Sequence, residues 1–254
     1  MTAIPVDVVF LAAGFATRLY PLTLNRAKPL LEVGGQPMLG RLLGQVAELD
    51  GVRRGIVVSN GKFFGDFEQF VEDSDSALPL SVVNDGAMDN EGRLGAIRDL
   101  ELGLRELAKN TDEPRPEGYL VLACDNLFEF DLGQLVRGFQ ASGVTQLTVR
   151  SIPEPVPPGR YSEVVLEGNT VTSFREKPAD PRSDLSAIAA YLFPAELPER
   201  LDQYLSSSRD PDAPGHLLAW WSKRWPLEAH RLTGRFWDIG NEADLARANS
   251  EFSR

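Results

Sequence analysis

The chain has 254 residues, of which 43% are hydrophobic and 25% charged, a composition that is typical of a globular protein and excludes a disordered or fibrous one. Its formal net charge of −11 opposes binding to polyanions, so neither nucleic acid nor a membrane is expected as a partner, and any phosphate requires a local basic pocket. The single cysteine, Cys124, excludes an intramolecular disulfide, and no basic segment of a signal peptide precedes Val6, so we expect a cytoplasmic protein.

Strand and helix patterns alternate through the first half of the chain. Apolar runs predict strands at 6–11, 55–59, 80–83 and 119–124. Apolar residues three or four positions apart predict helices at 38–49, 63–71 and 94–107. This alternation favours an α/β fold with a mainly parallel, doubly wound Rossmann-like sheet that has helices on both faces.

The pattern changes after residue 144, where strands predominate. The predicted strands are 147–152, 163–166, 171–174, 183–193 and 227–232, and the predicted helix is 196–205. The turn Glu167-Gly168-Asn169 joins two of these strands as a tight hairpin. We expect a single domain over residues 1–254, with a boundary between its halves near residue 143 and a small β-rich subregion in the second half.

A loop of small residues, LAAGFATRLYPLT, follows the first strand and begins at Leu11. It has neither the spacing of a P-loop nor the Gly-x-Gly-x-x-Gly pattern of a dinucleotide-binding loop. Backbone N–H groups in such a turn can approach phosphate oxygens, and Thr17, Arg18 and Lys28 supply further donors. Taken alone, the loop is equally compatible with a purely structural turn.

Four stretches in order along nearly the whole chain resemble the motifs of the sugar-1-phosphate nucleotidyltransferases. They are Gly14 to Thr23 followed by Ala27-Lys28-Pro29, Ala123-Cys124-Asp125-Asn126, Phe174-Arg175-Glu176-Lys177-Pro178, and Phe236-Trp237-Asp238-Ile239-Gly240-Asn241. In the stretch 90–96, where the family reads the base, Leu94-Gly95-Ala96 loosely resembles the Leu-Gly-Thr-Ala segment of the family. The resemblance implies an enzyme that transfers a nucleotidyl group from a nucleoside triphosphate to a sugar 1-phosphate and releases pyrophosphate, with Mg²⁺ as the cofactor. Residues 1–143 are then the nucleotide-binding half and residues 144–254 the sugar-phosphate-binding half.

The resemblance also implies roles for individual residues. Catalysis is assigned to Arg18, Lys28 and Asp125, and the metal to Asp125 and Asp238. The nucleotide is assigned to Leu11, Ala13, Gly14, Phe15, Ala16, Thr17, Asn84, Asp85 and Gly95. The sugar phosphate is assigned to Asn126, Glu176 and Lys177. Ala16 departs from the family pattern, which has glycine there, and a Cβ is unfavourable if the loop needs a positive φ.

Several of these residues also fit structural roles. Asp125 and Asp238 are typical of turns and helix caps. The pair Asn84-Asp85 is typical of a turn after a strand. Glu176 and Lys177 are typical of a solvated pair of charges, whereas Trp237 is expected in the core. His216 and His230 lack metal-ligand spacing and receive no role.

The class of function leaves alternatives open. A cytidylyltransferase that acts on phosphocholine or inositol phosphate, or a non-catalytic homologue that binds nucleotide sugars and regulates a partner, would carry similar motifs. A glycosyltransferase would require an Asp-x-Asp motif at a strand end, and we expect Asp210-Pro211-Asp212 to be remote from one. The choice of nucleotide stays open because the glutamine of thymidine- and uridine-using members has no clear counterpart. Homo-oligomeric assembly is compatible with the family.

Overall fold

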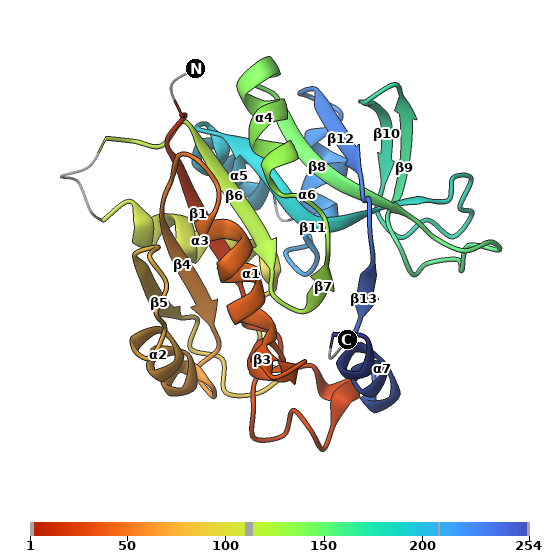
Figure 1. The fold of residues 1–254 in the computed structure, drawn as a ribbon. Coiled ribbons are helices and arrows are strands. Elements are labelled where there is room, and N and C mark those ends of the chain that lie inside the picture. Colours follow the sequence, from red (N-terminus) through yellow and green to blue (C-terminus); the bar gives the residue numbers. More distant parts are fainter. Residues whose placement is uncertain (1–2, 110–113, 208, 253–254) are drawn as a thin grey trace.

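A nine-stranded sheet organises the protein, whose computed structural model describes residues 3–109, 114–207 and 209–252. The spatial order of its strands is β5-β4-β1-β6-β11-β8-β12-β10-β9 (Figure 1). Their bounds are β1 Val6–Leu11, β4 Val52–Ser59, β5 Leu80–Asn84, β6 Gly118–Ala123, β8 Thr145–Ser151, β9 Glu163–Glu167, β10 Thr170–Arg175, β11 Leu185–Pro194 and β12 Leu227–Arg231.

The two halves of this sheet differ in strand direction. Strands β5, β4, β1 and β6 pair in parallel, and all of them precede residue 143. Strand β11 runs antiparallel to both β6 and β8, whereas β12 pairs in parallel with β8, and β9 and β10 form the expected hairpin. The expected α/β class is therefore confirmed, with parallel pairing concentrated in the first half and mixed pairing in the second.

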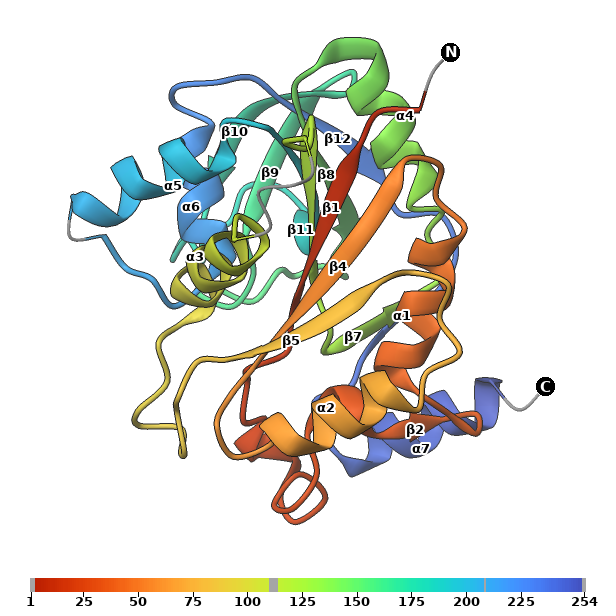
Figure 2. The same ribbon diagram turned by 90° about the vertical axis from the view of Figure 1, so that its left-hand side faces the viewer.

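Helices cover both faces of the sheet (Figure 2). Helices α1 (Met38–Ala47), α2 (Phe64–Glu72) and α4 (Gly133–Ser142) pack on one face, and α3 (Ala96–Leu107), α5 (Leu197–Ser206) and α6 (Pro214–Trp221) pack on the other. Alternate residues of β1 enter the two cores, since Val8 and Phe10 join the first and Val9 the second. This burial on both faces explains why the central strands are uninterrupted apolar runs. In the portion of the chain that is described, no helix combines the length and the apolar character needed to cross a lipid bilayer.

Several elements have no counterpart among the predicted ones. They are the 3-10 helices η1 (Thr17–Leu19) and η2 (Lys28–Leu30), the short strands β2 (Glu32–Val33), β3 (Gln36–Pro37), β7 (Asn126–Phe128) and β13 (Phe236–Asp238), and helices α4, α6 and α7 (Glu242–Phe252). Strands of two or three residues show no periodicity that a sequence pattern could reveal. Helix α6 is buried around most of its circumference, so its residues do not alternate between apolar and polar faces.

The C-terminal segment forms a third, smaller core with the loop after β1. Trp237 is 4% exposed and packs with Leu19 and Val33 in this core. Its indole N–H donates to the Glu251 carboxylate at 2.7 Å, and its ring centroid lies 4.5 Å from that of Phe252. The prediction that Trp237 is a core residue is therefore confirmed, and its burial fixes the position of the neighbouring Asp238.

Candidate functional site

A cavity of about 730 Å³ opens where β1 and β6 end, at the carboxyl edge of the parallel half of the sheet. This edge is the usual location of ligand sites in open α/β sheets. The residues that line the cavity are Leu11 to Leu19, Lys28, Pro29, Asn90, Arg93, Gly95, Ala96, Asp99, Ala123, Asp125, Asn126, Ala189, Asp212, Pro214 and Asp238 to Gly240. Segments far apart in the sequence therefore contribute to one site.

The loop after β1 adopts the conformation that a glycine would favour. Ala16 has φ 47° and ψ 44°, in the left-handed region, where a side chain costs about 1–2 kcal/mol. Its carbonyl accepts hydrogen bonds from the Thr23 hydroxyl and the Leu19 N–H, both at 2.9 Å. A Cβ at Gly14 would meet no atom within 4 Å. The loop thus holds a strained residue in place by its own hydrogen bonds and leaves Gly14 facing open space.

Phe15 anchors this loop. Its side chain is 3% exposed, and the ring centroid lies 6.4 Å from that of Phe63 in the core beneath. Only the backbone of Phe15 therefore faces the cavity. A nucleotide, to which the motif assigns this residue, could contact it through backbone atoms alone.

Two cations from different segments reach the cavity. Arg18 is exposed and makes no ion pair or hydrogen bond with its side chain in the described parts of the chain. The Lys28 side chain is only 7% exposed, and its Nζ lies 3.7 Å from Asp125 Oδ2. The first cation is free to bind an anion, and the second is buried beside a carboxylate.

Two carboxylates meet at the same place because of a strand pairing. Asp125 lies in the short turn between β6 and β7, and its side chain is 56% exposed. In the antiparallel pair of β7 and β13, Asp238 lies opposite Asn126, which puts the two Cα atoms about 5 Å apart. The Asn126 amide donates to Asp125 Oδ1 at 2.8 Å. The structure therefore brings Asp125, Asn126 and Asp238 together.

This pair of carboxylates fits a hard divalent cation that keeps most of its other ligands. Both side chains are exposed and line the cavity, and Mg²⁺ is usually held by one or two carboxylates together with waters and substrate phosphates. Among the described residues, no group of three or more His, Cys, Asp or Glu side chains could hold a metal ion by itself. A cation at this place would therefore depend on oxygens of a bound substrate.

The segment after β5 forms a turn outside the cavity lining. Asn84 Oδ1 accepts a hydrogen bond from the Gly86 N–H, and Asp85 Oδ1 accepts one from the Ala87 N–H, each at 2.7 Å. Neither Asn84 nor Asp85 lines the cavity. The turn role of this pair is thus directly observed, and any contribution to ligand binding must pass through a neighbour.

Gly95 does line the cavity, at a point where two segments meet. It has φ 92°, and a Cβ on it would lie 2.6 Å from the Pro211 carbonyl oxygen. The Asp212 and Pro211 carbonyls accept hydrogen bonds from the first two N–H groups of α3, those of Ala96 at 3.1 Å and Ile97 at 3.0 Å. Glycine is therefore required here because another part of the backbone occupies the space of its side chain.

The loop that holds Asp210-Pro211-Asp212 borders the cavity through this contact with α3. It precedes α6 and follows no strand, but Asp212 lines the cavity and pairs with Arg93 at 3.0 Å. The loop reaches α3 through backbone carbonyls, so no side-chain pattern in the sequence could have revealed the contact.

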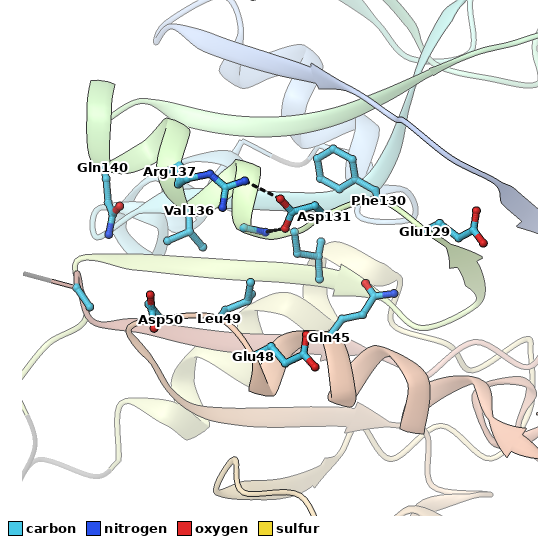
Figure 3. A pocket seen from close by; sticks show the side chains of 13 residues that line it. Gln45, Glu48, Leu49, Asp50, Glu129, Phe130, Asp131, Val136, Arg137 and Gln140 are labelled. Carbon is cyan, nitrogen blue, oxygen red and sulfur yellow. Dashed lines mark hydrogen bonds and ion pairs between the residues drawn. The ribbon is translucent and has the colours of Figure 1, made fainter. Parts of the chain in front are cut away.

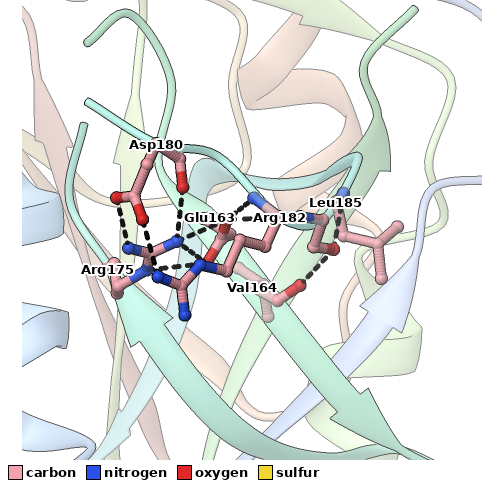
Figure 4. A network of polar contacts seen from close by, with 7 residues as sticks. Glu163, Val164, Arg175, Asp180, Arg182 and Leu185 are labelled. Carbon is pink, nitrogen blue, oxygen red and sulfur yellow. Dashed lines mark hydrogen bonds and ion pairs between the residues drawn. The ribbon is translucent and has the colours of Figure 1, made fainter. Parts of the chain in front are cut away.

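The motif that contains Arg175 is fixed by a buried carboxylate (Figure 4). Glu163 is 3% exposed and accepts hydrogen bonds from the Arg175 guanidinium at 2.8 and 2.9 Å, and from the N–H groups of Arg182 and Ser183. Burial acts to raise the pKa of Glu163, but these N–H groups and the guanidinium hold the pKa below its usual value. Asp180 bridges the two arginines, at 2.8 Å from each.

Glu176 and Lys177 follow directly but do not line the cavity. The Glu176 side chain is 8% exposed, and a Cβ on Gly215 of α6 would lie 1.8 Å from its Oε2. Burial raises the pKa of Glu176. Lys177 has a left-handed backbone, φ 44°, and its Nζ lies 3.8 Å from Glu176 Oε1. Glu176 is thus packed against α6 next to Pro214, at the margin of the cavity, and Lys177 lies beside Glu176.

A second cavity, of about 530 Å³, lies between α1 and α4 (Figure 3). Its charged lining is mostly acidic, with Glu48, Asp50, Glu129 and Asp131. Its one lining cation among the described residues, Arg137, is bound to Asp131 at 2.6 Å. This cavity is therefore unsuited to a phosphate ligand, in contrast to the one beside β1.

Sequence reasoning did not identify every residue of the main cavity. Asp99 and Ala189 line it and were not predicted, whereas Asn90 and Arg93 lie in the stretch 90–96 that the family resemblance associates with the base. Asp99 left a detectable signal, since it is a carboxylate one helical turn after Gly95 and shares a buried helix face with Leu100 and Gly103. The others come from loops or from the middle of a long strand.

Comparison with known proteins identifies relatives over nearly the whole chain. The family model described as "Nucleotidyl transferase" matches residues 7–254. The bifunctional protein GlmU of Methanocaldococcus jannaschii is 25% identical over 249 residues, which are 96% of this chain and 53% of that protein. The glucose-1-phosphate thymidylyltransferase of Streptomyces griseus is 26% identical over 247 residues, 94% of this chain and 64% of that protein. The chain thus spans about half to two thirds of the length of these relatives.

Solved structures share the fold at lower identity. A UDP-glucose pyrophosphorylase complexed with UDP-glucose superposes with a TM-score of 0.79 at 19% identity, over 98% of both chains. The UTP-bound UGPase of Acinetobacter baumannii superposes with a TM-score of 0.75 at 18% identity, over 98% of this chain and 93% of that one. At these identities the likeness concerns the fold.

Proposed function

The chain belongs to the nucleotidyl transferase family, and on that premise we propose that it transfers a nucleotidyl group from a nucleoside triphosphate to a sugar 1-phosphate and releases pyrophosphate. One observation carries the proposal. Two cations, Arg18 and Lys28, and two carboxylates, Asp125 and Asp238, line one cavity although they lie far apart in the sequence. This set of charges suits a reaction between two phosphate-bearing anions.

The proposed reaction is an attack by a phosphate oxygen of the sugar 1-phosphate on the α-phosphorus of the triphosphate. The bond between that oxygen and the α-phosphorus forms, the bond from the α-phosphorus to the bridging oxygen breaks, and pyrophosphate leaves. Catalysis then consists mostly of alignment and charge neutralisation. The free Arg18 guanidinium can bind the departing pyrophosphate through two parallel N–H bonds. The buried Lys28 ammonium supplies a fixed positive charge beside Asp125.

Asp125 and Asp238 are proposed to hold a divalent cation, and Mg²⁺ is the ion that this donor set favours. When bound, the cation would neutralise charge on the phosphates. Asn126 orients Asp125 through its amide hydrogen bond. The protein's own contribution is therefore to hold the two carboxylates close together, one just before β7 and one at the end of β13, and open to the cavity.

The residues at the margin of the cavity are proposed to receive the sugar phosphate. The exposed Lys177 is available for the attacking phosphate, and the Glu176 carboxylate for sugar hydroxyls. This role is supported by their place beside Pro214, which lines the cavity. With this assignment, residues 1–143 form the proposed nucleotide-binding half and residues 144–254 the proposed sugar-phosphate-binding half.

The test is an assay of pyrophosphate release with Mg²⁺ over a matrix of nucleoside triphosphates and sugar or alcohol phosphates. We expect turnover with at least one sugar 1-phosphate and none when EDTA replaces the metal. Turnover with phosphocholine or inositol phosphate alone would overturn the choice of acceptor. The absence of turnover with every pair, together with binding of nucleotide sugars, would identify a regulatory binding protein instead.

A further inference from the structure

Two carboxyl groups with buried oxygens, Asp99 in the cavity wall and Asp85 outside the lining, are not used by the reaction proposed above. Asp99, in the first turn of α3, is 7% exposed and lines the cavity. Its Oδ1 and the Oδ2 of Asp85 are both buried and, within the described residues, have no hydrogen-bond partner. A buried carboxylate without a partner is strongly disfavoured in a folded protein.

One proton shared between the two groups would give each of these buried oxygens a partner. Burial, followed by the charge of Asp85 and a hydrogen bond to it, raises the pKa of Asp99 to about 7. Burial also raises the pKa of Asp85. Near neutral pH a proton on Asp99 can therefore bridge to the buried oxygen of Asp85. That proton is engaged inside the pair, so the pair presents acceptor oxygens to any ligand in the cavity.

The position of a base in the cavity follows from the charges, and this step rests on the proposed function. Phosphates belong beside Arg18 and Lys28. The base is then left with the uncharged wall formed by Leu11, Ala13 and Gly95, next to Asp99. The third lining cation, Arg93, is paired with Asp212 and lies half exposed at the rim.

We propose that the Asp85–Asp99 carboxyl pair makes the site select a nucleotide whose base carries an amino group on its pairing edge, namely adenine, cytosine or guanine, over uracil or thymine. An amino group donates to a carboxyl oxygen in either protonation state of the pair. Uracil and thymine instead present two carbonyl oxygens on either side of a single N–H. At the ring position where the cytosine amino group would donate to the pair, uracil and thymine place a carbonyl oxygen, and the Asp85–Asp99 pair has no donor for it because its proton is engaged.

The magnitude of such discrimination is set by unmatched polar groups. Leaving a buried acceptor opposite another acceptor costs about 1–3 kcal/mol, which corresponds to roughly tenfold or more in binding. CTP and UTP form the sharpest matched pair of ligands, since their bases differ in whether an amino group or a carbonyl oxygen stands at the same ring position. The amide of Asn90, which also lines the cavity, can serve either base and so does not decide between them.

The experiment compares equilibrium dissociation constants and kcat/KM for ATP, CTP, GTP, UTP and dTTP in three proteins. These are the wild type, Asp99→Asn, and Asp202→Asn as a matched control on the exposed face of α5. We expect the wild type to bind its best amino-bearing triphosphate at least tenfold more tightly than UTP or dTTP, and CTP more tightly than UTP. In Asp99→Asn an N–H donor replaces the shared proton, so the preference for the best amino-bearing triphosphate over UTP or dTTP should fall at least fivefold. Asp202→Asn should retain this preference.

The outcomes separate this inference from the proposed reaction. A wild-type preference for UTP or dTTP, or an unchanged ratio in Asp99→Asn, would overturn the selectivity while leaving the reaction intact. Selective binding of the triphosphates without turnover would overturn the reaction and support the selectivity. If none of the five triphosphates binds, both are wrong.

Discussion

The two ends of the proposed site treat their charges in opposite ways. Beside the loop after β1, Arg18 has no partner in the described residues, and Asp125 and Asp238 stand exposed in the cavity. In the second half of the chain, Arg175 is held by Glu163 and Asp180, and no charge of that network is left unpaired. The first arrangement leaves charged side chains unpaired and open to a ligand, whereas the charges of the second are paired with one another within the chain.

This difference distinguishes the charged side chains that position the backbone from those that are available for chemistry. A carboxylate buried with a bidentate arginine and two backbone N–H groups fixes a segment rigidly, as Glu163 does for residues 175 to 183. An exposed and unpaired arginine contributes little to folding, since exposed ion pairs themselves are worth about 0–1 kcal/mol. Substitutions at the two ends should therefore separate loss of activity from loss of stability.

The largest effect is expected for Asp125→Asn. The substitution keeps the volume of the side chain and removes the charge that would hold the cation, so kcat/KM should fall by about 10³-fold. The side chain is 56% exposed, so the melting temperature should change little. Pyrophosphate release and thermal unfolding measure the two effects, with Asp202→Asn as the control. Activity above one tenth of the wild-type value would refute the metal-binding role.

Arg18→Ala should have the next largest effect and should likewise leave stability unchanged. Loss of a bidentate phosphate contact should lower kcat/KM by about 10²-fold. Arg18→Lys keeps the charge without the planar fork and should recover only part of this loss. Steady-state kinetics with varied triphosphate measures the effect. A large fall in melting temperature with little loss of activity would mean that Arg18, like Arg175, stabilises the fold and does not bind the triphosphate.

Glu163→Gln should reverse the pattern and affect stability first. Breaking the pair leaves Arg175 without its main partner, and the free energy of unfolding should fall by about 2 kcal/mol at pH 7. The Michaelis constant for the sugar 1-phosphate should rise several-fold, because Lys177 loses the anchor of its segment, while that for the triphosphate should stay unchanged. Glu167→Gln, on an exposed position of the same strand, is the control.

The pH dependence of stability gives a second measurement on Glu163. Its pKa is lowered in the folded protein, so its contribution is present above the unfolded pKa, about 4.3, and is lost as the pH falls through the lower folded value. Between pH 5 and pH 3 the wild type should therefore lose more stability than Glu163→Gln in denaturant unfolding. Parallel curves for the two proteins would contradict the buried ion pair.

Ala16→Gly should have the smallest effect. The left-handed backbone of Ala16 costs about 1–2 kcal/mol, which glycine relieves, but glycine also gives the unfolded chain about 0.4–1 kcal/mol of added freedom. A net gain of about 0.5 kcal/mol is expected, measured as a small rise in melting temperature. Ala108→Gly, at an ordinary right-handed position, should instead destabilise. Destabilisation by Ala16→Gly would show that the loop is not strained at this residue.

The sequence predicted the elements and motifs that depend on local pattern. The apolar runs of the central strands, the burial of Trp237 and the grouping of Arg18, Lys28 and Asp125 around one edge were accessible because strand ends of a parallel sheet meet there. The contact of Pro211 with Gly95 was not accessible, since it is made between backbones. The proximity of Asp85 to Asp99 could not be predicted either, because it depends on how the loop after β5 packs against α3.

The pairing of β7 with β13 determines when, during its synthesis, the chain can complete the site of the proposed reaction. Strand β13 brings Asp238 beside Asn126, and these residues are separated by much of the second half of the chain. During synthesis Arg18, Lys28 and Asp125 emerge long before residue 238, and N-terminal regions fold first. A nascent chain can thus assemble both cations and one carboxylate, but the proposed reaction becomes available only when the late segment has been made and has paired with a strand formed much earlier.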